Sequence, residues 1–214
     1  DLSRSMMRPK HFVVLCLLFL SGCSGSSGKS PQQPPQPAAC NDSAPTAQSL
    51  YVLPYTVSES YRVNQANCSG FGHSDFWRYG YDFVMDIGTV VTAARDGTVV
   101  HARDGATDGD RNNTNLVTIR HDDGTVALYS HLTLNGVLVT AGQFVNAGDT
   151  IGLSGDTGNT GGLPHLHFSL HPCSDLPGLP GAGSCPSIFV NFRNTSENDN
   201  GLVAGRSYVA MPLD

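Results

Sequence analysis

The sequence predicts an all-β fold, and three observations indicate it. Beyond Ser49, no window of about a dozen residues shows the periodicity of an amphipathic helix. Charged residues make up only 14% of the chain, below the globular norm of about 25%, which excludes long surface helices rich in Glu and Lys. Short β-branched runs instead alternate with turn signals in a chain that contains 24 Gly and 13 Pro. This alternation is typical of strands joined by turns.

Seven β-branched or alternating runs are the predicted strands: 81–85, 89–94, 98–102, 115–121, 125–131, 150–153 and 165–171. Asp96-Gly97 and Asp123-Gly124 stand between such runs and predict hairpin turns. The polar stretch 104–113 predicts the solvated tip of a longer hairpin.

Composition also limits the partners. The net charge is −6, and no cluster of Lys or Arg is present that could follow a phosphate backbone, so nucleic acid is not an expected partner. Hydrophobic residues at 39% are enough for one core, and the length suits one domain with accessory segments. The sequence carries no signal of oligomeric state.

The N-terminal part reads as a targeting segment. Basic residues at 8–10 precede the apolar run Phe12–Leu20 and the small residues Ser21 and Gly22, as in a secretory signal. The apolar run is shorter than the roughly 20 residues that a membrane span needs. Leu20-Ser21-Gly22-Cys23 resembles the lipobox of bacterial lipoproteins, which implies cleavage before Cys23 and lipidation of that residue. The alternative is an ordinary signal peptide with a chance Cys.

Three regions follow from this reading. Residues 1–22 are expected to be upstream residues and the signal peptide, and residues 23–44 a lipidated Cys with a tether rich in Ser, Gly, Pro and Gln. Residues 45–214 are expected to form the folded domain. The protein would then be exported and periplasmic, with the membrane as a partner through the lipid. Ser24 resembles the pattern that sorts lipoproteins to the outer membrane.

Four cysteines remain beyond the lipobox: Cys40, Cys68, Cys173 and Cys185. An even number in an exported chain favours two disulfides, and three pairings are possible. The favoured pairing is Cys40–Cys68 with Cys173–Cys185, because the second bond closes a Pro/Gly-rich loop that has little other means of ordering.

The stretch 165–171 reads His-Leu-His-Phe-Ser-Leu-His. In a strand, alternate side chains face opposite ways, so the three apolar residues are expected in the core and the histidines together on the other face. Imidazoles at i and i+2 stand about 7 Å apart, close enough to serve one metal site. The alternative is a solvated polar face.

Further motifs occur in a specific order along the chain. Gly72-His73 is followed by Asp82, by the run 88–100, by Tyr129-Ser130-His131-Leu132 and by the Gly-rich turn 155–162 that leads into the His-rich strand. In this order the chain resembles the M23 (lysostaphin/LytM-like) zinc metallopeptidases over about residues 71–171. The resemblance implies an antiparallel LytM-like domain with long loops, one Zn²⁺ ion, and peptide cross-links of bacterial peptidoglycan as the substrate.

The resemblance also assigns roles to residues. It places metal ligands at Asp82 and His167 and the catalytic histidines at His131 and His165, without separating the base from the oxyanion stabiliser. The commonest pattern puts the first ligand four residues before the Asp, where this chain has Arg78, and Arg cannot give up its proton to bind a metal. His73, nine residues before Asp82, resembles the first ligand of another branch of the family.

The expected function is therefore a zinc-dependent endopeptidase that acts on peptidoglycan stem peptides. The alternative is a catalytically inactive LytM-like lipoprotein that binds the cell wall or activates a separate amidase. The sequence leaves open whether the bond cut joins D-Ala to diaminopimelate or lies in a Gly bridge. Trp77 is expected either to line the groove or to lie in the core, and His101, His121 and His171 are expected to be surface or strand-end residues.

Overall fold

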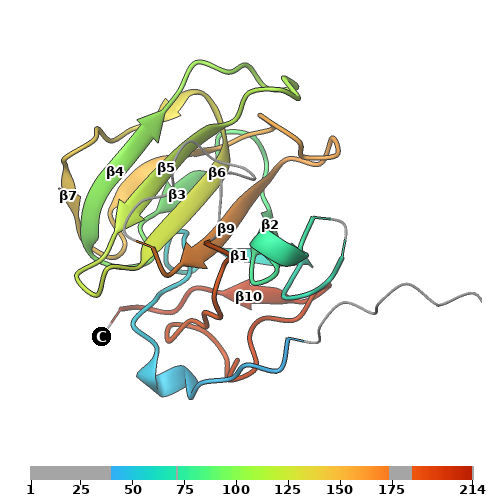
Figure 1. Cartoon of the computed structure of the whole chain (residues 1–214), viewed down its shortest axis with the longest axis vertical. Helices are drawn as coiled ribbons and strands as arrows, with labels where there is room; N and C mark the ends of the chain where they lie inside the picture. Colours follow the sequence, from blue (N-terminus) through green and yellow to red (C-terminus); the bar gives the residue numbers. More distant parts are fainter. Residues whose placement is uncertain (1–39, 71, 174–184, 214) are drawn as a thin grey trace, which may run out of the picture. The chain divides into compact units, whose positions relative to one another are not determined.

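Antiparallel strands dominate the computed structural model, which describes residues 40–70, 72–173 and 185–213 (Figure 1). The strands are β1 (Ser60–Gln65), β2 (Tyr81–Val84), β3 (Val90–Thr92), β4 (Gly97–Arg103), β5 (Asn115–Arg120), β6 (Val126–Val137), β7 (Phe144–Val145), β8 (Thr150–Ser154), β9 (His165–His171) and β10 (Ser207–Val209). Two short 3₁₀ turns, η1 (Thr46–Gln48) and η2 (Asp75–Trp77), are the helical elements of the described part. The all-β prediction is confirmed.

The sheet order is β10-β1-β2-β9-β6-β5-β4-β7, and β8 pairs with both β3 and β6. Every strand pairing is antiparallel. The signal segment, Cys23 and the tether up to residue 39 lie outside the described residues. Within the described residues, no helix is long and apolar enough to cross a membrane.

The predicted strands correspond closely to those of the structure, and 165–171 matches β9 at both ends. Three strands were not predicted: β1, β7 and β10. Two of these have only two or three residues, and β1 reads Ser-Tyr-Arg-Val-Asn-Gln, which lacks a clear apolar alternation. Short or polar strands owe their conformation to their neighbours in the sheet, so their own sequence gives little indication of it.

One of the two predicted hairpin turns is wrong. Asp123-Gly124 joins the paired strands β5 and β6, but Asp96-Gly97 joins β3 and β4, which pair with other strands. Gly97 lies inside β4 for a different reason. A Cβ at this position would stand 2.5 Å from the carbonyl oxygen of Arg120, so glycine allows β4 to approach β5 closely.

The stretch 104–113 does join the paired strands β4 and β5, but it is more than a solvated tip. The carboxylate of Asp108 accepts hydrogen bonds from Thr133 Oγ1 (2.5 Å) and the backbone N–H of Asp156 (2.7 Å). The hairpin is thereby fixed against β6 and the segment after β8, next to the turn that precedes β9.

The core lies between the faces of this folded sheet and is rich in aromatic rings. Its largest fully buried side chains include Tyr81, Phe83, Tyr129, Phe168 and Phe192. Leu166, Phe168 and Leu170 of β9 belong to the core as predicted. The opposite face of β9 is also buried, because the rings of Phe76 and Trp77 pack against His171 at 4.9 and 5.8 Å.

Two disulfides are present, Cys40–Cys68 and Cys173–Cys185, which is the pairing that the sequence favours. Residues at the end of the segment assigned to the tether contact the domain as well. Asp42 accepts a hydrogen bond from the hydroxyl of Tyr79, and the backbone N–H of Ala44 donates to the carbonyl of Asp199 (2.9 Å).

Candidate metal centre

Three side chains from three parts of the chain meet beside the sheet: His73, Asp82 and His167. Asp82 on β2 and His167 on β9 are direct partners in the antiparallel register, and His73 arrives from the loop that joins β1 to β2. His73 Nε2 lies 3.1 Å and His167 Nδ1 2.8 Å from the same oxygen, Asp82 Oδ1. The candidate ligand atoms of the three residues lie within 4.8 Å of one another.

The three residues are 3%, 3% and 8% exposed. Burial raises the pKa of the Asp82 carboxyl, but hydrogen bonds from His167 and His73 outweigh it and hold that pKa well below its usual range. Burial also lowers the pKa of His167. The site therefore presents an ionised carboxylate and a neutral imidazole at neutral pH, which are the protonation states that a metal ion requires of its ligands.

His73 is oriented by the backbone. Its Nδ1 lies 3.2 Å from the carbonyl oxygen of Ala66. A carbonyl oxygen can only accept, so Nδ1 carries a proton, and Nε2, which faces Asp82, is the ring nitrogen left to bind a metal. Metal-binding histidines are commonly fixed by this kind of hydrogen bond to the other ring nitrogen.

The donor set fits a catalytic zinc ion. Two imidazole nitrogens and one carboxylate oxygen leave a fourth tetrahedral position for water or substrate. His167 Nε2 is buried without a hydrogen-bond partner among the described residues. A buried polar atom is rarely left without a partner unless it has another function, such as binding a metal. Arg78 lies apart from this cluster: its side chain is exposed, and its guanidinium stands over the ring of Tyr79 at 5.1 Å.

His131 and His165 lie next to the cluster, and their ring centroids are 4.7 Å apart. His165 opens β9, and its Nε2 is 3.6 Å from Asp82 Oδ2. His131 lies on β6 just past Ser130, the last residue of β6 that pairs with β9. Its φ is +69°, a left-handed conformation that is uncommon for a residue other than glycine and is concentrated at functional sites.

Backbone carbonyls also set the tautomers of these two rings. His131 Nδ1 is 2.6 Å from Thr157 O, and His165 Nδ1 is 2.7 Å from Leu163 O. In the neutral form of each ring, Nε2 is therefore the atom with a free lone pair. Burial, together with the neighbouring His165 and His167, lowers the pKa of His131 to about 3, so this ring is neutral at pH 7.

All five side chains line one cleft of about 480 Å³. Its other lining residues include Gln65, Trp77, Arg103, Thr114, Asn159 and Thr160. Trp77 lines the cleft, with its ring 5.2 Å from that of His167. Arg103 and Thr114 were not predicted as lining residues. Arg103 pairs with Leu116 where β4 meets β5, and its Nε donates to Thr114 O (2.9 Å), contacts that the sequence does not indicate.

Gly80 stands directly behind the cluster. A Cβ at this position would lie 2.8 Å from His167 Cε1 and 3.2 Å from His73 Cε1. We expect Gly80→Ala to displace both rings and to weaken zinc binding by about 10 to 100-fold, as other losses of ligand support do. Competition with a chromophoric chelator measures the dissociation constant, and Ser74→Ala in the same loop is the control. An unchanged constant in Gly80→Ala would refute this role.

Two of the three remaining histidines lie at strand ends as expected, His171 as the last residue of β9 and His121 directly after β5, but both are buried. His171 is fully buried; its Nδ1 donates to Cys185 O (2.9 Å), and Ser169 Oγ lies 3.0 Å from its Nε2. His121 is buried as well, with Nδ1 2.8 Å from Asp96 O. Each ring can donate its Nδ1 proton to a backbone carbonyl, so it can be buried in the neutral form. Sequence alone did not reveal these partners.

His171 makes the stability of the fold depend on pH. Burial lowers its pKa to about 4, below the ordinary value of about 6.5. As the pH is lowered, the His171 ring of the unfolded chain becomes protonated near pH 6.5, whereas the ring in the folded chain stays neutral until about pH 4. The free energy of unfolding therefore falls as the pH is lowered from about 6.5 to about 4. The contribution is about 3 kcal/mol.

Urea unfolding of the metal-free protein at several pH values between 7.5 and 4 measures this dependence. His171→Gln removes the titrating ring, and we expect its profile to be flatter than that of the wild type. Equal slopes for the two proteins would show that His171 is not responsible.

Comparison with known proteins agrees with this geometry. The profile of the peptidase family M23 matches residues 77–176. The peptidoglycan DD-endopeptidase ShyA of Vibrio cholerae is 44% identical over 91 residues, which are 42% of this chain and 19% of ShyA. The chain thus spans about a fifth of that relative.

Two solved structures are also similar. A zinc-containing peptidase from Vibrio cholerae is 30% identical over 56% of this chain and 36% of its own, with a TM-score of 0.43. The catalytic domain of the antimicrobial peptidase lysostaphin from Staphylococcus simulans is 33% identical over 53% of this chain and 79% of its own, with a TM-score of 0.38.

The matched region includes Asp82, His131, His165 and His167. The chain belongs to peptidase family M23. His73 lies four residues before the matched region begins at Trp77, so its place in the cluster is known from the structure. Zn²⁺ is the cofactor that both the family and the donor set indicate.

Proposed function

We propose that the protein is a zinc-dependent endopeptidase that hydrolyses peptide cross-links of bacterial peptidoglycan. One observation carries the proposal: His73, Asp82 and His167 converge as ligands in the same cleft as His131 and His165. A relative that is 44% identical over this region is named a peptidoglycan DD-endopeptidase, which supports the cell wall as the substrate.

In this mechanism His73, Asp82 and His167 are the metal ligands. Zn²⁺ held by these residues would lower the pKa of water and polarise the scissile carbonyl. Nε2 of His131 or His165, each free to accept, takes up the proton of the attacking water. That nitrogen then becomes a donor, which can stabilise the developing oxyanion and return the proton to the leaving amine.

The surroundings of the site support these roles. Trp77 lines the cleft, and its indole ring lies 5.2 Å from the ring of His167. Asn159, Thr160 and Gly161, from the turn before β9, line the cleft as well.

The location of the enzyme is part of the proposal. Two disulfides agree with an oxidising compartment outside the cytoplasm. The apolar run Phe12–Leu20 with Cys23 supports export, cleavage before Cys23 and a lipid anchor, with residues 23–44 as the connecting segment. Ser24 supports retention at the outer membrane, from which the domain would reach the wall from the periplasmic side.

Release of muropeptides from isolated sacculi tests the function. The purified protein is loaded with zinc and incubated with sacculi. The soluble products are then separated and identified by mass spectrometry. We expect cross-linked dimers to be converted to monomers, with loss of activity in the presence of a chelator. Zinc-loaded protein that leaves the cross-links intact would overturn the proposal in favour of an inactive LytM-like protein that binds the wall or activates an amidase.

A further inference from the structure

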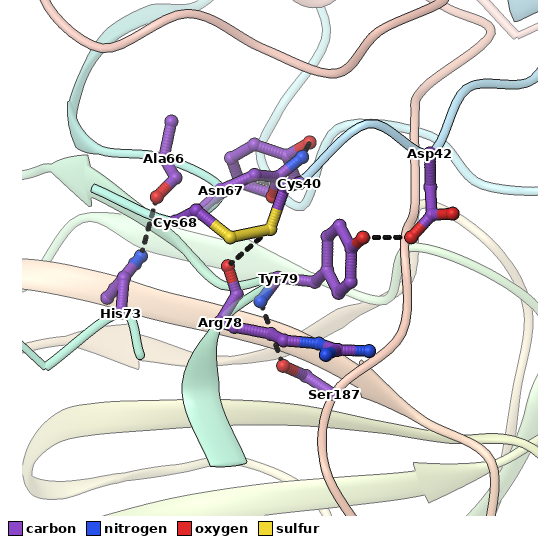
Figure 2. The surroundings of a disulfide bond; sticks show 10 residues. Cys40, Asp42, Ala66, Asn67, Cys68, His73, Arg78, Tyr79 and Ser187 are labelled. Atoms are coloured by element: carbon purple, nitrogen blue, oxygen red, sulfur yellow. Dashed lines mark hydrogen bonds between the residues drawn. A yellow bond between two sulfur atoms is a disulfide. The ribbon is translucent and has the colours of Figure 1, made fainter. Parts of the chain in front are cut away.

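The loop that delivers His73 is joined covalently to the start of the described chain. Cys68 lies five residues before His73 and forms the disulfide with Cys40. Two residues before Cys68 is Ala66, whose carbonyl oxygen holds His73 Nδ1 at 3.2 Å. Figure 2 shows the disulfide, Ala66 and His73 side by side. The bond thus lies within the short stretch 66–73 that determines where the first metal ligand stands.

The same disulfide lies against the segment that leads to the second ligand. The backbone N–H of Cys68 donates to Arg78 O (2.7 Å), and Cys40 Sγ lies 3.8 Å from that oxygen (Figure 2). Arg78 is only four residues before Asp82. The contact with Arg78 therefore fixes the spacing between the His73 loop and strand β2.

Cys40 is itself held on the other side. The N–H of Ala44 donates to Asp199 O (2.9 Å), and the N–H of Thr46 donates to Asp199 Oδ1 (2.6 Å). Asp42 accepts from Tyr79 (Figure 2). The disulfide consequently connects an anchored segment to the His73 loop and is not a link between two free ends.

The backbone at Cys68 needs such support. Its φ is +54°, the left-handed region that costs a side-chain-bearing residue energy and persists where the surroundings enforce it. The bond to Cys40 is one of the contacts that hold this residue at positive φ, beside the hydrogen bond from its N–H to Arg78 O. A change at Cys68 on loss of the bond would move Ala66 O relative to the His73 ring, because both belong to the loop that contains Cys68.

We propose that the Cys40–Cys68 disulfide is a positioning element of the metal centre and that tight zinc binding depends on it. The bond holds Ala66 O where it fixes the tautomer and direction of His73, so that Nε2 faces Asp82. This inference rests on the proposed function only in taking zinc as the metal. It concerns affinity for the ion and is independent of which bond the enzyme cuts.

The test compares two double variants. Cys40→Ser with Cys68→Ser removes the proposed positioning bond, and Cys173→Ser with Cys185→Ser removes the other disulfide as a control. Zinc dissociation constants are measured by competition with a chromophoric chelator, and the melting temperature of each metal-free protein is recorded beside them. We expect the first variant to bind zinc about 10 to 100-fold more weakly than the wild type and the control to change much less.

The two readouts separate positioning from general stability. Both variants lose a cross-link and are expected to melt at lower temperature, whereas only the first should lose zinc affinity while folded. Excess zinc should restore cleavage by the first variant. Unchanged affinity in that variant, or an equal loss in both variants, would overturn the inference.

A second measurement covers the case in which the first variant does not fold. In the Cys173→Ser, Cys185→Ser background, Cys40–Cys68 is the disulfide left to reduce in the described part of the chain. A water-soluble phosphine converts it to two thiols and becomes the phosphine oxide, with water supplying the oxygen and both protons. Zinc release from the folded protein on reduction supports the inference, and retention of zinc refutes it.

Failure of the proposed function looks different. A wild-type protein that binds zinc but does not cleave sacculi would refute the endopeptidase proposal. The role of the disulfide would still be judged on the zinc dissociation constants alone.

Discussion

His167→Ala is expected to abolish stoichiometric zinc binding and to lower the rate of peptidoglycan cleavage by about 10³-fold or more. A catalytic metal supplies several kcal/mol of transition-state stabilisation, and each 1.36 kcal/mol is a factor of ten in rate. His167 is buried against Asp82, and its replacement by Ala removes one of the three ligands. His73→Ala should behave in the same way.

Metal analysis of the purified variants and muropeptide release measure the two effects. Arg78→Ala is the matched control for the first ligand, since Arg78 occupies the position of the commonest family pattern but lies apart from the cluster. His121→Ala controls for loss of a buried histidine elsewhere in the fold. Wild-type cleavage by either His167→Ala or His73→Ala would contradict the assigned ligand set.

The second large effect concerns His131, which we place in proton transfer and not in metal binding. His131→Asn is expected to keep one zinc ion per chain and to lower the cleavage rate by about 10² to 10⁴-fold, the range for loss of a general acid or base. Asn tolerates the left-handed backbone at this position and can still donate to Thr157 O, but it has no nitrogen that can accept a proton.

Zinc content, the melting temperature and the cleavage rate are compared with those of the wild type. The separation between zinc content and rate is the informative result, because His167→Ala should lose both. A His131→Asn protein that loses its zinc would make His131 a ligand or a structural residue. One that cleaves at the wild-type rate would leave His165 as the sole proton carrier.

Much of the site could be predicted from the sequence because its residues lie on regular elements. The alternation in 165–171 predicts β9 and the face that His165 and His167 share. The family resemblance assigns Asp82 and His167 as ligands, and in the structure the register of β9 against β2 places these two residues directly opposite each other. Local patterns and tertiary packing agree there, which is the condition under which sequence reasoning succeeds.

The remaining features depend on backbone atoms and long-range packing. The tautomers of three histidines are fixed by backbone carbonyl oxygens, those of Ala66, Thr157 and Leu163. Because every residue has a backbone carbonyl, the residue type does not indicate which carbonyl will accept such a hydrogen bond. The burial of His121 and His171 depends in the same way on Asp96 O and Cys185 O. His73 could be proposed from its resemblance to the first ligand of another branch of the family, but only the fold of the loop between β1 and β2 shows its ring beside Asp82.

The most direct test of the account is an anomalous difference map at the zinc absorption edge from crystals of the zinc-loaded protein. We predict a single peak per chain between the side chains of His73, Asp82 and His167, with Arg78 directed away from it. A peak that excludes His73, a peak elsewhere in the fold, or no peak in zinc-saturated crystals would contradict it.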